Sequence, residues 1–100
     1  MANSLIDEMR NGDSNAIIAG LLHHGAIYRM NAIAFSSLQR RSNKEIVEKI
    51  KALKTDRFGI DGYSVSDFAI AALDILGIEK YTGSSQNIKR LIDCRFDFMA

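Results

Sequence analysis

Apolar residues recur along the chain at the three- and four-residue spacing of an α-helix, and strict alternation of apolar and polar residues never lasts. The chain contains no proline, so glycines and capping side chains must begin and end the helices. These patterns predict six short helices, each near or below the length that is stable alone. The predicted helices cover residues 4–10, 13 or 14 to a stop or bend at Gly25, 27–40, 42 to about 53, 64–76, and 84 or 85 to about 92.

Two helix starts carry the residues of side-chain caps. Ser42 and Glu45 have the spacing of a capping box and predict the start of the fourth helix, and residues 64–67 (Ser-Val-Ser-Asp) cap the fifth. After the last helix, Phe96 is expected to face inward. The tail that follows it either packs or frays.

The segment 55–63 between the fourth and fifth helices contains three large apolar residues, Phe58, Ile60 and Tyr63. These side chains predict a packed loop rather than a linker. The segment also contains acidic residues and glycines, which are typical of calcium-binding loops. Such a loop needs oxygen ligands at alternate positions, and Phe58 and Ile60 stand where ligands would be wanted, so a calcium site is not expected.

The predicted helix over 27–40 is apolar on two faces, so we expect it to have neighbours on two sides and to lie at the centre of the fold. When the sequence is aligned with itself at an offset of 35 residues, this helix matches the one over 64–76. Both then place a small alanine between larger apolar residues, a spacing that lets a partner helix approach closely. The matched positions are Met30, Ala34 and Leu38 with Val65, Ala69 and Leu73.

Residues 65–77 (VSDFAIAALDILG) resemble the first-helix signature of a HEAT or armadillo-type repeat. The helix over 27–40 is a poorer copy, because Ser36 and Ser37 stand where alanine is usual, and the proline common near the start of a HEAT hairpin is missing. The resemblance covers residues 14–94 and implies an all-α, HEAT/armadillo-like right-handed solenoid of antiparallel helix pairs. A compact helical bundle with chance periodicity is the alternative. Either would form a single helical domain over residues 1–100.

Composition narrows the functional classes. A hydrophobic fraction of 47%, a charged fraction of 25% and a net charge of +1 are typical of a globular domain without a strong charge bias. The single cysteine, Cys94, forms no internal disulfide and suits a reducing compartment. The chain has neither a secretory signal pattern nor an apolar run near the length of about 20 residues that spans a membrane. We therefore expect a cytoplasmic protein without a membrane partner.

No catalytic motif rises above background, so the chain is not expected to be an enzyme or to hold a cofactor, a metal or a small-molecule substrate. The adjacent His23 and His24 point about 100° apart on a helix and cannot ligate one metal as a pair four residues apart would. Cys94 has Arg95 beside it but no well-placed base in sequence, and it is expected to be a structural or idle thiol.

Two surfaces are candidates for a macromolecular partner. One is an acidic face with exposed tyrosine and isoleucine side chains that could anchor a protein partner. In the alternative interpretation, Ile70 packs against a neighbouring helix instead. The residues of the acidic face are Asp61, Tyr63, Asp67, Ile70, Asp74 and Tyr81. The other lies in the block 29–57, where eight basic and three acidic residues give a net charge of +5. Its candidate patch is Arg40, Arg41, Lys44, Lys51 and Lys54.

A rigid helical array without catalytic motifs is typical of proteins that bind other macromolecules. The preferred hypothesis is a protein-binding module that uses the acidic face. In size and helical build the chain resembles immunity proteins of contact-dependent growth-inhibition systems. That resemblance implies an antitoxin that blocks a nuclease-type toxin by steric and charge complementarity. The alternative is nucleic-acid binding through the basic block, unless that block is a solvated face with pairs such as Glu45 and Lys49.

Overall fold

The computed structural model describes residues 4–100, over which the chain forms six α-helices, one two-stranded sheet and a final 3-10 turn. The mostly helical class is thus confirmed. No helix within these residues has the length and apolar character needed to cross a membrane. The elements are α1 (Leu5–Arg10), α2 (Ser14–Leu21), α3 (Ala26–Leu38), α4 (Lys44–Ala52), β1 (Gly59–Ile60), β2 (Tyr63–Ser64), α5 (Val65–Ile75), α6 (Gln86–Cys94) and η1 (Asp97–Met99).

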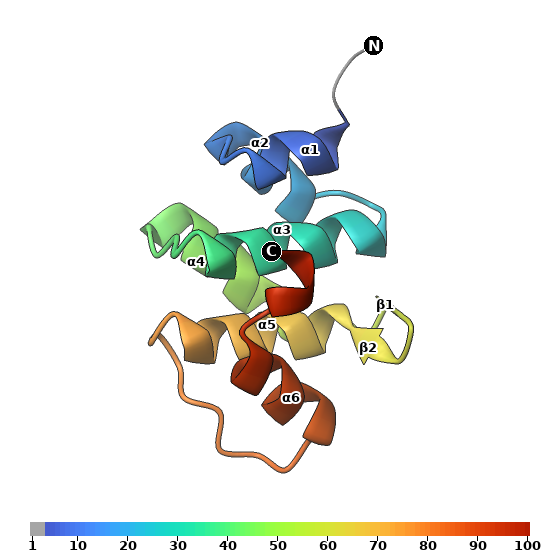
Figure 1. The fold of residues 1–100 in the computed structure, drawn as a ribbon, viewed down its shortest axis with the longest axis vertical. Coiled ribbons are helices and arrows are strands. Elements are labelled where there is room, and N and C mark those ends of the chain that lie inside the picture. The colour runs from blue at the N-terminus through green and yellow to red at the C-terminus, as the bar shows by residue number, and fades with distance from the viewer. Residues whose placement is uncertain (1–3) are drawn as a thin grey trace.

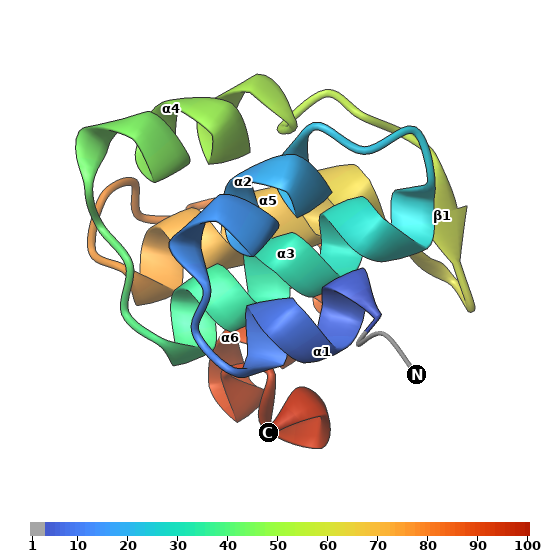
Figure 2. The same cartoon turned by 90° about the horizontal axis from the view of Figure 1, so that it is seen from above.

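Along the long axis of the molecule, α1 and α2 lie at one end, α3 and α4 follow, α5 comes next, and α6 lies beyond α5 at the other end (Figure 1). The central helix is α3, which packs on α2 and α1 on one side and on α5 on the other. Every residue from Arg29 to Ser37 is buried, which confirms the prediction of neighbours on two sides. Helix α4 makes its main contacts with α5 and α2, not α3, and Figure 2 shows it set to one side of the stack.

The cap predictions are confirmed at α5 and wrong at α4. The side chain of Ser64 accepts a hydrogen bond from the Asp67 backbone N–H, and the Asp67 carboxylate accepts one from the Ser64 N–H, which completes a capping box. Helix α4 instead begins after Asn43, with no side-chain cap, so Ser42 lies one position too early to reach the first turn. The Arg41 side chain donates hydrogen bonds to Gly12, in the connection between α1 and α2, and to Ser14, the first residue of α2, and residues 41–43 lie outside the helix.

The segment predicted as a packed loop contains a β-hairpin. Gly59 pairs with Ser64 and Ile60 with Tyr63, and the two residues between the strands, Asp61 and Gly62, both have positive φ, 56° and 86°. This is the pattern of a two-residue type I′ turn, for which Asp-Gly is a preferred sequence. A Cβ on Gly59 would overlap the carbonyl oxygen of Tyr63, so only glycine allows the strands to approach this closely.

The hairpin corrects the packing prediction as well. Tyr63 is half-buried, but Ile60 is exposed and Phe58 keeps 74% of its surface open to solvent. A two-stranded ribbon has too few residues to bury an apolar side chain on each face, so Phe58 is left without a covering element.

The chain beyond α6 packs rather than frays. Arg95 and Phe96 both adopt left-handed backbone conformations, with φ of 53° and 60°, and this pair turns the chain back toward the core. The Phe96 side chain is fully buried, as predicted, and its ring lies 5.0 Å from that of Phe68. The turn η1 then brings Met99 against the core and leaves Phe98 exposed.

Candidate functional site

Exposed apolar side chains gather around two neighbouring clefts. Within residues 4–100 six large apolar residues are exposed, and five of them line these clefts, while Ile78 lies apart in the turn after α5. Large exposed apolar patches are uncommon on monomeric proteins and mark interaction sites, so clefts lined by exposed apolar side chains are candidates for such a site. We call these five residues the apolar surface: Leu22, Ile27, Phe58, Ile60 and Phe98.

The first cleft, which we call the hairpin cleft, has a volume of about 410 Å³ and lies between α3, the hairpin and the C-terminal turn. Its wall is mostly apolar and includes Ile27, Ile60 and Phe98 of the apolar surface. The polar groups along it are few. The side-chain amide of Asn31 donates a hydrogen bond to the Ile27 carbonyl at 2.7 Å, and Asp61 lies at the tip of the hairpin.

The second cleft, which we call the Arg29 cleft, has a volume of about 520 Å³. It lies between the connection from α2 to α3 and the connection from α4 to β1, and the exposed Leu22 and Phe58 line it. The polar and ionisable side chains along it are His23, His24, Arg29, Thr55, Asp56 and Arg57.

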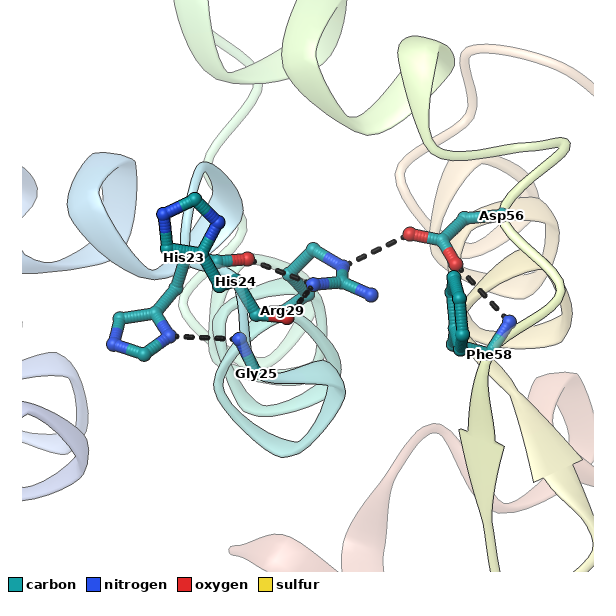
Figure 3. A network of polar contacts seen from close by, with 6 residues as sticks. All are labelled: His23, His24, Gly25, Arg29, Asp56 and Phe58. Atoms are coloured by element: carbon teal, nitrogen blue, oxygen red, sulfur yellow. Dashed lines mark hydrogen bonds and ion pairs between the residues drawn. The ribbon is translucent and has the colours of Figure 1, made fainter.

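Arg29 holds the two connections of this cleft together (Figure 3). Its Nε donates to Asp56 Oδ2 at 2.9 Å, and its Nη1 donates to the carbonyl oxygens of both His23 and His24 at 2.7 Å. Asp56 uses its other oxygen to accept the N–H of Phe58 at 3.1 Å. The buried guanidinium therefore fixes the backbone next to Leu22 relative to the backbone of Phe58.

The two histidines have structural contacts. The Nδ1 of His23 accepts the N–H of Gly25, the residue that caps α3, at 2.9 Å, and its ring stacks on Tyr28 at 4.1 Å. His24 is exposed at the Arg29 cleft. Within residues 4–100 no three His, Cys, Asp or Glu side chains are placed to hold a metal ion. Cys94 is half-buried, with its Sγ 3.6 Å from the carbonyl oxygen of Leu91.

The acidic face predicted from the sequence is divided between different parts of the fold. Asp61 and Tyr63 line the hairpin cleft, whereas Ile70 and Tyr81 line a separate pocket of about 250 Å³ beside Lys54 and Glu79. The remaining two residues have hydrogen bonds that stabilise the fold: Asp67 closes the α5 capping box, and Asp74 accepts the N–H of Tyr81 at 2.8 Å.

The basic patch loses two of its five predicted members to contacts within the chain. Arg41 donates to the carbonyl oxygen of Gly12 and to the Ser14 hydroxyl, and Lys54 forms an ion pair with Glu79 at 2.7 Å. Arg40, Lys44 and Lys51 have no ion pair within residues 4–100. Elsewhere in the block, Arg29 is buried and paired with Asp56, because the central position of α3 leaves its long side chain inside the fold. The charge available to a polyanion is thus smaller than the sequence count of the block.

The Lys54–Glu79 pair makes the stability of the fold depend on pH. The hydrogen bond from Lys54 lowers the pKa of Glu79 below its usual value of 4.5. A carboxyl group with a lowered folded-state pKa stabilises the fold above its unfolded pKa, and this contribution is lost as the pH falls through the folded value. We expect the melting temperature of Glu79→Gln to lie slightly below that of the wild type at neutral pH, and the difference is small because the pair is partly exposed. The two melting temperatures should converge in acid, where protonation of Glu79 breaks the pair in the wild type. Melting curves that stay parallel across this range would contradict the assignment. Glu48→Gln is the matched control.

Sequence reasoning placed Tyr63 and Asp61 near a binding site but missed the apolar surface. Leu22, Ile27 and Phe98 were not among the candidate residues. The available signal was that each of these residues stands next to a helix end or turn, where a large apolar side chain has no neighbouring turn of helix to cover it.

Comparison with protein-family models, with curated proteins and with solved structures finds no match to this chain.

Proposed function

We propose that this chain is a non-enzymatic protein-binding module whose partner covers the apolar surface. The observation that carries the proposal is that five of the six exposed large apolar side chains line two neighbouring clefts. Two of the five are phenylalanines, each more than half exposed. Burying an exposed side chain of this size contributes about 1.5 to 3 kcal/mol, so these residues suit the anchor positions of an interface.

The composition around the anchors also favours a protein partner. His24, Arg57 and Asp61 surround the apolar side chains with polar groups of both signs. An apolar centre with a polar rim is the usual composition of a protein–protein interface. A nucleic-acid interface would instead present a positive surface to the phosphates, and paired contacts within the chain engage Arg29, Arg41 and Lys54.

We also propose how the helices are arranged and to which class of protein the chain belongs. The packing of α3 on α2 and on α5 supports a solenoid-like stack in the manner of HEAT or armadillo proteins, while α4 departs from that pattern by packing on α5 and α2 instead of α3. In its specific form, the module is a cytoplasmic immunity protein or antitoxin that covers a nuclease-type toxin. The small size and helical build support this form. It differs from the sequence hypothesis in the surface used, because hydrogen bonds of the fold engage Asp67 and Asp74 of the acidic face.

Phe58→Asp is expected to weaken partner binding strongly, whereas Ile78→Asp is expected to leave it unchanged. Both replace an exposed apolar side chain by a carboxylate, but only Phe58 belongs to the apolar surface. The tagged wild type and both variants would be used to capture proteins from the source cell's lysate, and the affinity of the captured partner would be measured with purified components. Loss of an interface anchor predicts a dissociation constant at least about thirtyfold higher for Phe58→Asp.

Three results would contradict the proposal. One is equal capture by Phe58→Asp and the wild type, and another is equal loss by both variants. The third is disappearance of every captured protein after nuclease treatment, which would favour the nucleic-acid alternative. A salt-dependent titration of duplex DNA and RNA, with Arg40→Gln as the variant, would then test that alternative directly.

A further inference from the structure

The guanidinium of Arg29 has two N–H donors that the fold does not use. An arginine carries five donors, one on Nε and two on each terminal nitrogen. Asp56 accepts from Nε, and the carbonyls of His23 and His24 accept from Nη1, which accounts for three. Within residues 4–100 Nη2 forms no hydrogen bond, and Figure 3 draws the terminal nitrogen without a dashed line on the side of the guanidinium away from the two carbonyls.

This nitrogen is open to the Arg29 cleft although the residue is only 9% exposed. Within residues 4–100 the only fully buried side-chain nitrogen or oxygen without a hydrogen-bond partner is the hydroxyl oxygen of Ser37. Since Nη2 of Arg29 also lacks a partner, it must keep contact with solvent, and the cleft is where Arg29 reaches the surface. The cleft thus has a fixed, positively charged donor in its wall.

The surroundings of Nη2 favour a carboxylate. Asp56 balances the charge of Arg29, and both of its oxygens already accept hydrogen bonds from the chain. Arg57 also lines the cleft, is exposed, and has no ion pair within the described residues. The local balance of Arg29, Asp56 and Arg57 is therefore positive. A carboxylate on a held guanidinium forms charge-assisted hydrogen bonds, which are stronger than neutral ones.

We infer that the Arg29 cleft receives an acidic side chain of the bound protein, whose carboxylate accepts hydrogen bonds from Nη2 of Arg29. Apolar residues of the partner next to this acidic residue would pack against Leu22 and Phe58. The inference rests on the proposed protein-binding function, and it names the chemistry of the partner at this site. An aspartate or glutamate within an apolar segment of the partner fits both the free donor of Arg29 and the exposed side chains of Leu22 and Phe58. The apolar side chains supply burial, and the guanidinium makes the site selective for a negative charge.

Two probes of equal shape test the charge selectivity. The ¹⁵N-labelled full chain would be titrated with 3-phenylpropanoate and, separately, with 3-phenylpropanamide, and NMR shifts would be followed at the Arg29 Nε–H and the backbone amides of His24 and Phe58. We expect saturable shifts at all three sites with the carboxylate and about tenfold weaker binding of the neutral amide. Arg57→Gln should weaken carboxylate binding several-fold, whereas Arg40→Gln, which removes an arginine outside the cleft, should not.

Several results would overturn the inference: equal binding of the two probes, an unmoved Arg29 signal, or the same loss in Arg40→Gln as in Arg57→Gln. These outcomes are separable from failure of the proposed function. If Phe58→Asp loses the protein partner while the cleft does not discriminate the two probes, the apolar surface is the interface and the acidic contact is wrong. If the carboxylate binds as expected but the partner ignores Phe58→Asp, the cleft binds carboxylates without serving that interface.

Discussion

Replacing Arg29 by methionine is expected to lower the free energy of unfolding by about 3 to 5 kcal/mol, as is usual when one member of a buried ion pair is removed. The variant leaves the Asp56 carboxylate without its cation in a site where it is mostly shielded from water. It also removes the donor to the carbonyl oxygens of His23 and His24. Small domains are stable by about 5 to 15 kcal/mol, so a large share of the total would be lost. Urea unfolding followed by circular dichroism measures the difference.

A double variant separates the buried charge from the lost hydrogen bonds. Asp56→Asn keeps an oxygen that can accept the Phe58 N–H but removes the unpaired charge. Adding it to Arg29→Met should therefore recover part of the lost stability, while the two carbonyls stay without their donor. Losses that simply add in the double variant would show that the ion pair contributes nothing of its own. A loss below about 1 kcal/mol for Arg29→Met would mean that the pair behaves as a surface salt bridge.

The helices could be predicted from the sequence because the signals that specify them are local. The apolar stripes placed all six to within a few residues, and side-chain caps predicted at Ser64 and at Ser84 or Ser85 marked two of the starts, the second of which is Ser85. The prediction for α4 was wrong for a reason outside its own sequence. Ser42 and Glu45 have the right spacing, but Ser42 lies outside the helix, next to Arg41, whose side chain is anchored on Gly12 and Ser14.

The hairpin could have been predicted, because its signal was present and was not used. The Asp-Gly dipeptide at 61–62 stands between Ile60 and Tyr63, and it favours a turn in which both residues have positive φ. The strands are only two residues long, so no alternation of apolar and polar residues indicates them. A packed loop and a tight hairpin have the same composition, and the turn residues alone distinguish them.

The candidate site could not be predicted, because it depends on which loops meet. Leu22 and Phe58 are far apart in the sequence and line one cleft only because Arg29 ties their connections together. The sequence marks Arg29 as one more cation in a basic block. Its burial follows from the central place of α3, and its pairing follows from the position of Asp56, a residue 27 positions later. A sum of charges along the chain therefore overstates the basic surface and misses the apolar one.

Phe96→Ala is expected to cost about 3 to 5 kcal/mol of stability, the range for truncating a fully buried phenylalanine. The two left-handed residues at the end of α6 are a conformation that costs energy, and it persists because it delivers the Phe96 ring into the core beside Phe68. Phe98→Ala is the matched control, since that ring is 63% exposed and its truncation should change stability by less than about 1 kcal/mol. Equal effects in urea unfolding would show that the tail does not dock as described.

The same pair of variants connects the core to the proposed interface. Phe98 and Met99 form part of the wall of the hairpin cleft, and the burial of Phe96 positions both. Phe96→Ala should therefore weaken partner binding indirectly, together with stability. Phe98→Ala should weaken binding while leaving the melting temperature nearly unchanged. If Phe98→Ala changes neither property, the partner does not reach the C-terminal turn, and the interface is confined to the connections around Leu22 and Phe58.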